Sequence, residues 1–147
     1  MSDAPRLDDQ LCFALYNASR AMTATYAPLL AELDLTYPQY LAMMVLWEAD
    51  GSRVSAIGDR LHLDSATLTP LLKRLEARGV IERRRSSEDE RVVEVFLTAD
   101  GKRLKTKAKH VQRCIFECAG MSLRQLVEMR EQLETLTARL RGPTVTE

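Results

Sequence analysis

The sequence lacks the long apolar runs that a membrane-spanning helix or a secretory signal requires. Glycine and proline are sparse, at 6 and 5 of 147 residues, and no repeats or low-complexity segments are present. Neither sign of charge is in excess, because Lys and Arg together number 21 and so do Asp and Glu. We therefore expect a soluble, cytoplasmic protein without a membrane partner, and the overall charge gives no indication of a polyanionic one.

Cysteine is also scarce, and the three residues present cannot all pair within one molecule. A structural disulfide framework is therefore not expected, and at least one thiol is predicted to be free or to pair between chains. With 46% hydrophobic residues, the chain is long enough to bury one sizeable core. Residues 1–147 are accordingly predicted to form a single domain.

Apolar periodicity and capping signals predict a mainly α-helical chain. The predicted helices cover residues 7–33 with a bend or interruption at Pro28, then 37–48, 54–61, 64–78, 98–120 and 122–141. Their start signals are Thr36 with Gln39, Asp64, Thr98, and Ser122 with Gln125, and Gly79 supplies one stop signal. The long helices lie at the two ends of the chain, where they are well placed to form a dimer interface.

After Gly79 the pattern changes to two β-rich stretches, Val80 to Arg85 and Arg91 to Leu97, separated by polar residues 86–90. This pattern predicts a two-stranded hairpin with a mobile tip. The expected fold class is mainly α with a small β-hairpin, that is, α+β.

The segment from Asp64 to Arg91 has the residues of a DNA-reading unit. Two short helices joined by a tight break match a helix-turn-helix, whose second helix enters the major groove. Outside its leucine face, the second helix carries Ser65, Thr67, Thr69, Lys73 and Arg74. Considered alone, such a polar helix face is more often simply solvated.

The predicted hairpin favours DNA binding over a solvated surface, because it adds Arg83, Arg84, Arg85 and Arg91 directly after the helix. An arginine at such a tip can enter a narrow minor groove. Asp89 is placed to orient the Arg91 guanidinium through a charge-assisted bond. We therefore predict a basic wing that binds double-stranded DNA together with the second helix.

Asp64 to Glu76, Gly79, the sequence Asp89-Glu90-Arg91 and the run from Leu97 to Gly101 together resemble the MarR family of dimeric transcriptional regulators. Residues 11–16 (LCFALY) and 35–40 (LTYPQY) resemble its OhrR branch, repressors that sense organic hydroperoxides. The resemblance implies a winged helix-turn-helix at 52–98, with residues 7–48 and 99–141 serving mainly as dimerisation helices. It also implies a DNA-binding protein rather than an enzyme, without cofactor or metal.

Cys12 is the candidate redox sensor. On a helical wheel it shares a face with Tyr16 and Tyr26, although Tyr26 lies about 21 Å away along the helix axis. If Cys12 and Tyr26 meet, Tyr26 must come from a partner chain. The resemblance implies that arrangement, with Tyr26 and Tyr37 donating hydrogen bonds to the sulfur, and such donors favour a reactive thiolate.

Two observations oppose this interpretation of Cys12. A lone helical cysteine and helix-face tyrosines are ordinarily packing residues. The neighbouring Asp8 and Asp9 also disfavour a thiolate, because they are negatively charged. Phenol donors would have to outweigh these carboxylates.

Cys114 and Cys118 lie four residues apart on a predicted helix, so they face the same way and should not bridge each other easily. In the two-cysteine members that the chain resembles, a thiol on a later helix of the partner resolves the sulfenic acid. Cys114 best matches that position, and Cys118 is the weaker candidate. His110 lies on the same face, so these three residues are also a weak candidate for part of a zinc site.

These features predict a homodimeric repressor that binds an inverted-repeat operator and releases it when an organic hydroperoxide oxidises Cys12. Three alternatives remain open. They are a MarR-type regulator that binds a small aromatic ligand without redox sensing, a thiol peroxidase, and a metal-responsive regulator using His110, Cys114 and Cys118.

Overall fold

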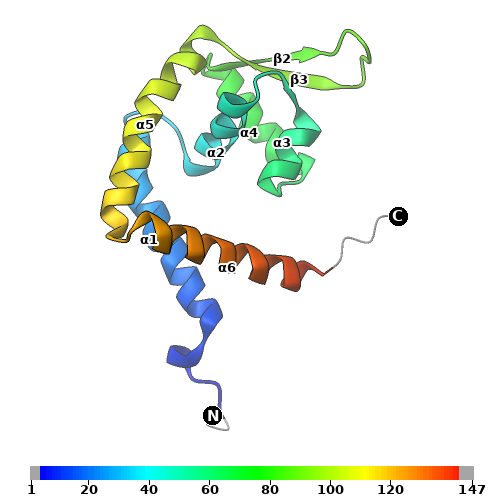
Figure 1. Ribbon diagram of the computed structural model, residues 1–147. Coiled ribbons are helices and arrows are strands. Elements are labelled where there is room, and N and C mark those ends of the chain that lie inside the picture. The colour runs from blue at the N-terminus through cyan, green and yellow to red at the C-terminus, as the bar shows by residue number, and fades with distance from the viewer. Residues whose placement is uncertain (1–3, 143–147) are drawn as a thin grey trace. The chain divides into compact units, whose positions relative to one another are not determined.

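A computed structural model describes residues 4–142 of the protein. Its elements are a short 3-10 helix η1 (Leu7–Asp9), α1 (Leu11–Ala31), α2 (Tyr37–Glu48), β1 (Ser52–Arg53), α3 (Val54–Leu61), α4 (Ser65–Ala77), β2 (Ile81–Arg85), β3 (Val93–Leu97), α5 (Ala99–Ala119) and α6 (Leu123–Arg141) (Figure 1). The chain divides into two compact units, with the boundary between Gln112 and Arg113 inside α5. No helix among residues 4–142 is long and apolar enough to cross a membrane.

The capping signals operate as predicted. At the start of α2, the Thr36 hydroxyl accepts from the Gln39 backbone N–H at 3.4 Å, and the Gln39 side chain accepts from the Thr36 N–H at 3.0 Å. Ser122 and Gln125 form the same reciprocal pair at the start of α6. These bonds satisfy backbone donors that a helix leaves unpaired at its first turn.

Two predictions for the first helix need correction. The predicted helix over 7–33 is split, because the backbone of Gln10 is extended and separates η1 from α1. Pro28 does not interrupt α1, which continues to Ala31.

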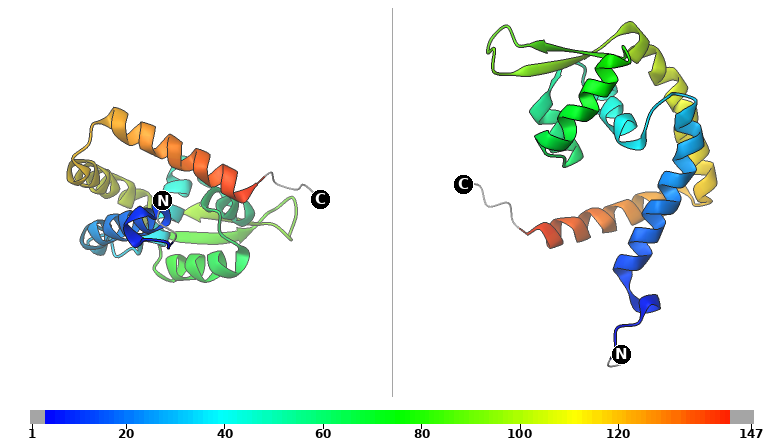
Figure 2. Two further views of the ribbon diagram at one scale, coloured as in Figure 1. Left: turned by 90° about the horizontal axis from the view of Figure 1, so that it is seen from below. Right: turned by 180° about the vertical axis from the view of Figure 1, so that it is seen from behind.

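The sheet has three strands rather than the predicted two, in the order β1-β3-β2, and all pairs are antiparallel. Arg83 pairs with Val95 in the β2–β3 hairpin, and Val95 also pairs with Ser52 of β1. Figure 1 and the view from behind in Figure 2 show the tip of the hairpin reaching past α3 and α4. The short β1 therefore ties the base of the wing to the start of α3.

The core of the larger unit lies between the helices and the sheet. The predicted leucine face of α4 is buried, and it consists of Leu68, Leu71, Leu72 and Leu75. They share the interior with side chains from α1, α2, α3 and the sheet, including Leu30, Met43, Leu46, Ile57, Ile81 and Val95. Burying each such side chain contributes about 1.5–3 kcal/mol, which fixes α4 with its polar face outward.

Candidate DNA interface and sensor site

The outer face of α4 presents the predicted DNA-reading side chains. Ser65, Thr67, Lys73 and Arg74 are exposed and Thr69 is half-buried. The Asp64 carboxylate caps the helix by accepting the Thr67 N–H at 2.8 Å, and this bond lowers the pKa of Asp64 below its usual value. A side-chain hydrogen bond from Thr67 also lowers the pKa of Asp64, so Thr67 contributes both its backbone and its exposed side chain to this cap.

The three consecutive arginines of β2 have different local partners. Arg83 is bound by Glu76 of α4, with 2.9 Å from Nη2 to Oε1 and 2.8 Å from the Arg83 backbone N to Oε2. The Arg84 guanidinium lies over the Phe96 ring, 4.7 Å from its centre, and Arg85 donates to the Glu90 carbonyl at 3.0 Å. Arg83 thus joins the wing to α4.

Arg91 projects from the wing in a fixed orientation. Its Nε donates to Oδ1 of Asp89 at 3.1 Å, its Nη2 donates to Oδ2 at 3.2 Å, and its backbone N donates to Oδ1 at 3.0 Å. These bonds lower the pKa of Asp89. The Arg91 side chain is still 90% exposed, so the predicted Asp89–Arg91 ion pair is confirmed and leaves the guanidinium accessible.

Two aromatic side chains predicted for the sensor do meet. The Tyr26 ring lies 4.9 Å from the ring of Tyr37 and 5.9 Å from that of Tyr40. Tyr40 is buried and its ring lies 6.1 Å from that of Trp47. Burial, followed by the neighbouring Tyr37 and Tyr40, raises the pKa of Tyr26 to about 12, so its phenol keeps its proton and can donate near neutral pH.

Sequence reasoning did not include Tyr40 in this cluster. Its three-residue spacing from Tyr37 on a helix is the signal that would have found it. Burial is also the main cause that raises the pKa of Tyr40.

Cys12 and Tyr16 lie on the N-terminal half of α1 and are both exposed. The Tyr16 ring lies 5.3 Å from the guanidinium carbon of Arg20, which is a cation–π contact rather than a contact with the other tyrosines. Cys12 and Tyr26 are both on α1, which is continuous, so they are about 21 Å apart along its axis. A single chain therefore does not bring Cys12 to the Tyr26–Tyr37 pair.

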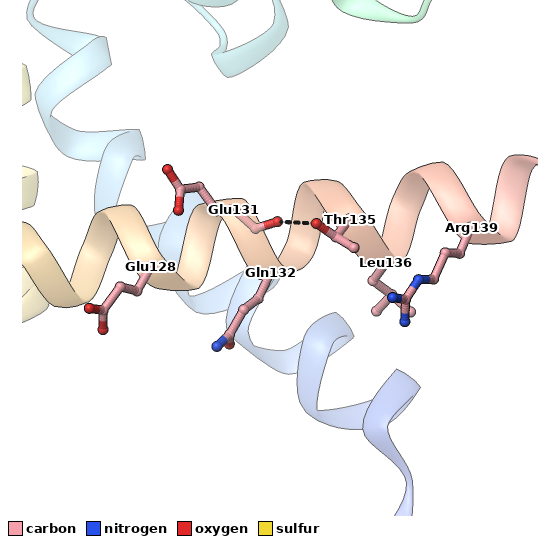
Figure 3. A pocket seen from close by; sticks show the side chains of 6 residues that line it. All are labelled: Glu128, Glu131, Gln132, Thr135, Leu136 and Arg139. Carbon is pink, nitrogen blue, oxygen red and sulfur yellow. Dashed lines mark hydrogen bonds between the residues drawn. The ribbon is translucent and has the colours of Figure 1, made fainter.

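The later cysteines are on α5, where Cys114 is half-buried and Cys118 is exposed. Among residues 4–142, no group of three or more His, Cys, Asp or Glu side chains is arranged to hold a metal ion. A hollow of about 400 Å³ on α6 is lined by Glu128, Glu131, Gln132, Thr135, Leu136 and Arg139 (Figure 3). In it, the Thr135 hydroxyl donates to the Glu131 carbonyl at 2.9 Å, and none of the predicted site residues is present.

Two further arginines were absent from the sequence-based site. Arg53 immediately precedes α3 and is exposed. Arg78 follows α4 and donates to the backbone carbonyls of Leu33 and Asp34 after α1.

A helix-turn-helix with a cationic outer face, joined to a hairpin that presents an oriented arginine, defines a winged helix-turn-helix DNA-binding protein.

Comparison with known proteins supports this class and narrows it. Residues 24–108 match the family described as transcriptional regulator SarA/Rot. The chain is 48% identical over 134 residues to the organic hydroperoxide resistance transcriptional regulator of Bacillus subtilis strain 168, covering 91% of each chain. The matches are transcriptional regulators rather than enzymes.

Comparison with solved structures also finds transcriptional regulators. Reduced AbfR bound to DNA matches with a TM-score of 0.77 and 36% identity, covering 93% of this chain and 96% of that one. AbfR is a protein of Staphylococcus epidermidis. A MarR transcriptional regulator from Methanosarcina mazei Go1 matches with a TM-score of 0.73 and 25% identity, covering 84% and 91%. The chain belongs to the MarR family of DNA-binding transcriptional regulators, among its OhrR-like members.

Proposed function

We propose that the protein is a homodimeric repressor that binds an inverted repeat of double-stranded DNA while Cys12 is reduced and releases it when an organic hydroperoxide oxidises Cys12. The observation that carries the proposal is the contact between Tyr26 and Tyr37, with ring centres 4.9 Å apart. Tyr26 remains protonated near neutral pH, so this pair offers a phenol donor suited to a thiolate. The relative from Bacillus subtilis is itself named as an organic hydroperoxide resistance regulator.

The proposed sensor requires two chains, because Cys12 and Tyr26 are too far apart on one α1. The apolar surface of α1 supports a dimer. Leu11 is 61% exposed and Met22 is 44% exposed in the single chain, and Phe13 is also exposed. A two-fold, antiparallel pairing of α1 helices would cover these side chains and place Cys12 of one protomer beside Tyr26 and Tyr37 of its partner.

The proposed chemistry has two steps. In the first, the Cys12 thiolate attacks the terminal oxygen of the hydroperoxide and the O–O bond breaks. With one proton taken up, this gives a Cys12 sulfenic acid and an alcohol. In the second, the thiol of Cys114 from the other protomer attacks the sulfenic sulfur, which forms a disulfide and releases water. Cys118 is the alternative resolving thiol.

The disulfide, rather than the first oxidation, is proposed as the step that releases DNA. For AbfR, the structures described as bound to DNA are those of the reduced and the overoxidized protein, and a disulfide form is a separate structure. In that relative, oxidation as such is therefore compatible with bound DNA. A covalent link between the dimerisation helices would change the spacing of the two DNA-reading units, which must match half-sites about one helical turn apart.

The test uses a duplex enriched from a random-sequence pool by reduced protein, called here the selected duplex. Wild-type protein is expected to release it after addition of an organic hydroperoxide, with a disulfide-linked dimer on a nonreducing gel. Cys12→Ser should bind equally well but should not be released. Cys118→Ser is the matched control and should behave as wild type, whereas Cys114→Ser should be oxidised without release. Persistence of the wild-type complex when the disulfide is fully formed would overturn the proposal.

A second candidate function is supported by a cavity of about 360 Å³ between α2 and the first part of α5. Its lining combines the aromatic rings of Tyr40 and Trp47 with Lys105 and Lys109. It also includes Glu48, whose carboxylate is paired with Arg60 at 2.8 Å. Lys105 donates to the Trp47 carbonyl at 3.0 Å. These side chains suit a small aromatic anion, and release of DNA by such a compound from Cys12→Ser would favour ligand control over redox control.

A further inference from the structure

A cleft of about 340 Å³ lies where the start of α3, the middle of α4 and the base of the wing meet. Its polar lining consists of three arginines, Arg53, Arg83 and Arg91, and two hydroxyl residues, Ser55 and Thr69. Val54, Leu72, Val92 and Val93 complete the wall, so no carboxylate is among its lining residues. Guanidinium forks and hydroxyls facing one cleft are typical of a site for a phosphate oxygen.

The charge balance of the cleft singles out Arg53. The Arg83 guanidinium is neutralised by Glu76, with 2.9 Å between Nη2 and Oε1. The Arg91 guanidinium is neutralised by Asp89, with 3.1 Å between Nε and Oδ1. Among the described residues, Arg53 forms no ion pair. The two ion pairs together carry no net charge, so the lining residues and their ion-pair partners leave the positive charge of Arg53, which complements a singly charged phosphodiester. Glu94 lies opposite Arg53 in the strand pairing but does not line the cleft.

The strand pairing places Arg53 for this role. β1 pairs with β3 through Ser52 opposite Val95 and Arg53 opposite Glu94, so the residue before α3 is fixed to the base of the wing. Arg53 is also close enough to Asp89 to contribute to lowering the pKa of that carboxyl. Arg53 and Arg91 therefore line one cleft beside Asp89, and Arg53 remains exposed there.

We propose that Arg53, with the fixed guanidiniums of Arg83 and Arg91, forms a binding site for one DNA backbone phosphate. This phosphate site lies between the part of α4 that contacts the major groove and the wing. The assignment of this phosphate site rests on the proposed function only in requiring that α4 and the wing face DNA. Arg53 supplies the net attraction, and Arg83 and Arg91 supply oriented donors. A contact at this place would fix the register between the groove read by α4 and the groove entered by the wing.

The test compares Arg53→Ala with Arg60→Ala in the reduced, full-length protein. Arg60 is the matched control, because it is an exposed arginine of α3, the helix that Arg53 precedes. Its partner is Glu48 at 2.8 Å, and it does not line the cleft. Affinity is measured over a range of salt concentrations with the selected duplex and with an unselected duplex of equal length. Thermal unfolding of each variant verifies the fold, and Arg53→Lys provides a conservative variant.

Arg53→Ala is expected to weaken binding to both duplexes by roughly tenfold and to lower the slope of log K against log salt by about 0.9 per subunit. Arg53→Lys should retain most of the slope and lose part of the affinity, because it keeps the charge without the fork. Arg60→Ala should stay within about twofold of wild type. An unchanged salt slope in Arg53→Ala, or a loss of affinity confined to the selected duplex, would overturn the proposed phosphate site.

The peroxide response separates this inference from the proposed function. The Arg53→Ala variant, bound to the selected duplex at low salt, should still release the duplex after addition of an organic hydroperoxide. The released fraction should equal that of wild type. If wild type is not released, the redox proposal fails while the salt slopes still decide the role of Arg53.

Discussion

The guanidinium of Arg78 binds Asp34 twice, through the Asp34 backbone carbonyl at 2.6 Å from Nη1 and through its carboxylate at 3.1 Å from Nε. Arg78 also donates to the carbonyl of Leu33. Arg78 follows the DNA-reading helix α4, and Leu33 and Asp34 follow α1, the helix that carries Cys12. This contact joins the end of the proposed sensor helix to the end of the reading helix within one unit.

Arg78→Ala is expected to lower the free energy of unfolding by about 1–3 kcal/mol, because it leaves helix-end carbonyls and a carboxylate without their charged donor. Urea unfolding measures the change. The exposed ion pair between Arg60 and Glu48 gives the control, since Arg60→Ala should cost at most about 1 kcal/mol. Equal losses in the two variants would show that Arg78 is an ordinary surface residue.

Tyr26 should make stability depend on pH in the alkaline range. Its pKa rises from the ordinary value of 10.0 to about 12 in the folded protein, so the folded state binds the phenolic proton more tightly than the unfolded state. The resulting stability is fully present below pH 10 and is lost as the pH rises from 10 to about 12. Tyrosinate absorbance during a pH titration measures the ionisation of the phenol. A titration curve that Tyr26→Phe leaves unchanged would contradict the assignment of the raised pKa to Tyr26.

Gly101 should tolerate a methyl group far less well than Gly79. A Cβ on Gly101 would lie 2.0 Å from the backbone oxygen of Val80, whereas one on Gly79 would meet nothing within 4 Å. Gly79 has φ of +80°, so Gly79→Ala carries only backbone strain of about 1–2 kcal/mol. Gly101→Ala must displace backbone and should cost about 3 kcal/mol or more. Urea unfolding of both variants measures the two losses in the free energy of unfolding. A smaller loss for Gly101→Ala than for Gly79→Ala would contradict this packing.

Asp89→Asn should weaken binding to the selected duplex about three- to tenfold, because Arg91 loses its charged, two-oxygen partner and its fixed orientation. Binding to an unselected duplex should not weaken, since the variant removes a negative charge near DNA. Glu90→Gln provides a control that removes the neighbouring charge and leaves the Asp89–Arg91 pair intact. A parallel change on both duplexes would mean that Asp89 acts only through charge.

Local signals in the sequence were sufficient for most of the fold. The Thr36 capping box, the Asp64 cap and the leucine face of α4 depend on residues three or four positions apart, and each was found as predicted. β1 was missed because its two residues, Ser52 and Arg53, are too short for a periodic pattern. Pairing with β3 defines that strand, and such pairing is invisible locally.

The site was predicted less completely, for the same reason. Asp89 and Arg91 are two residues apart, so their ion pair could be predicted. The bonds of Arg78 to Leu33 and Asp34 join positions 45 and 44 residues apart and depend on how α1 and α4 pack. The convergence of Arg53 with Arg83 and Arg91 likewise depends on strand order.

The proposed switch is a disulfide from Cys12 that releases the protein from DNA. The most direct measurement titrates the reduced protein on the selected duplex with an organic hydroperoxide and determines the bound fraction and the disulfide-linked fraction in the same samples. We predict that the bound fraction falls in proportion as the disulfide fraction rises, and that a thiol reductant removes the disulfide and restores the bound fraction. DNA that remains bound when the disulfide is complete would contradict the proposed switch.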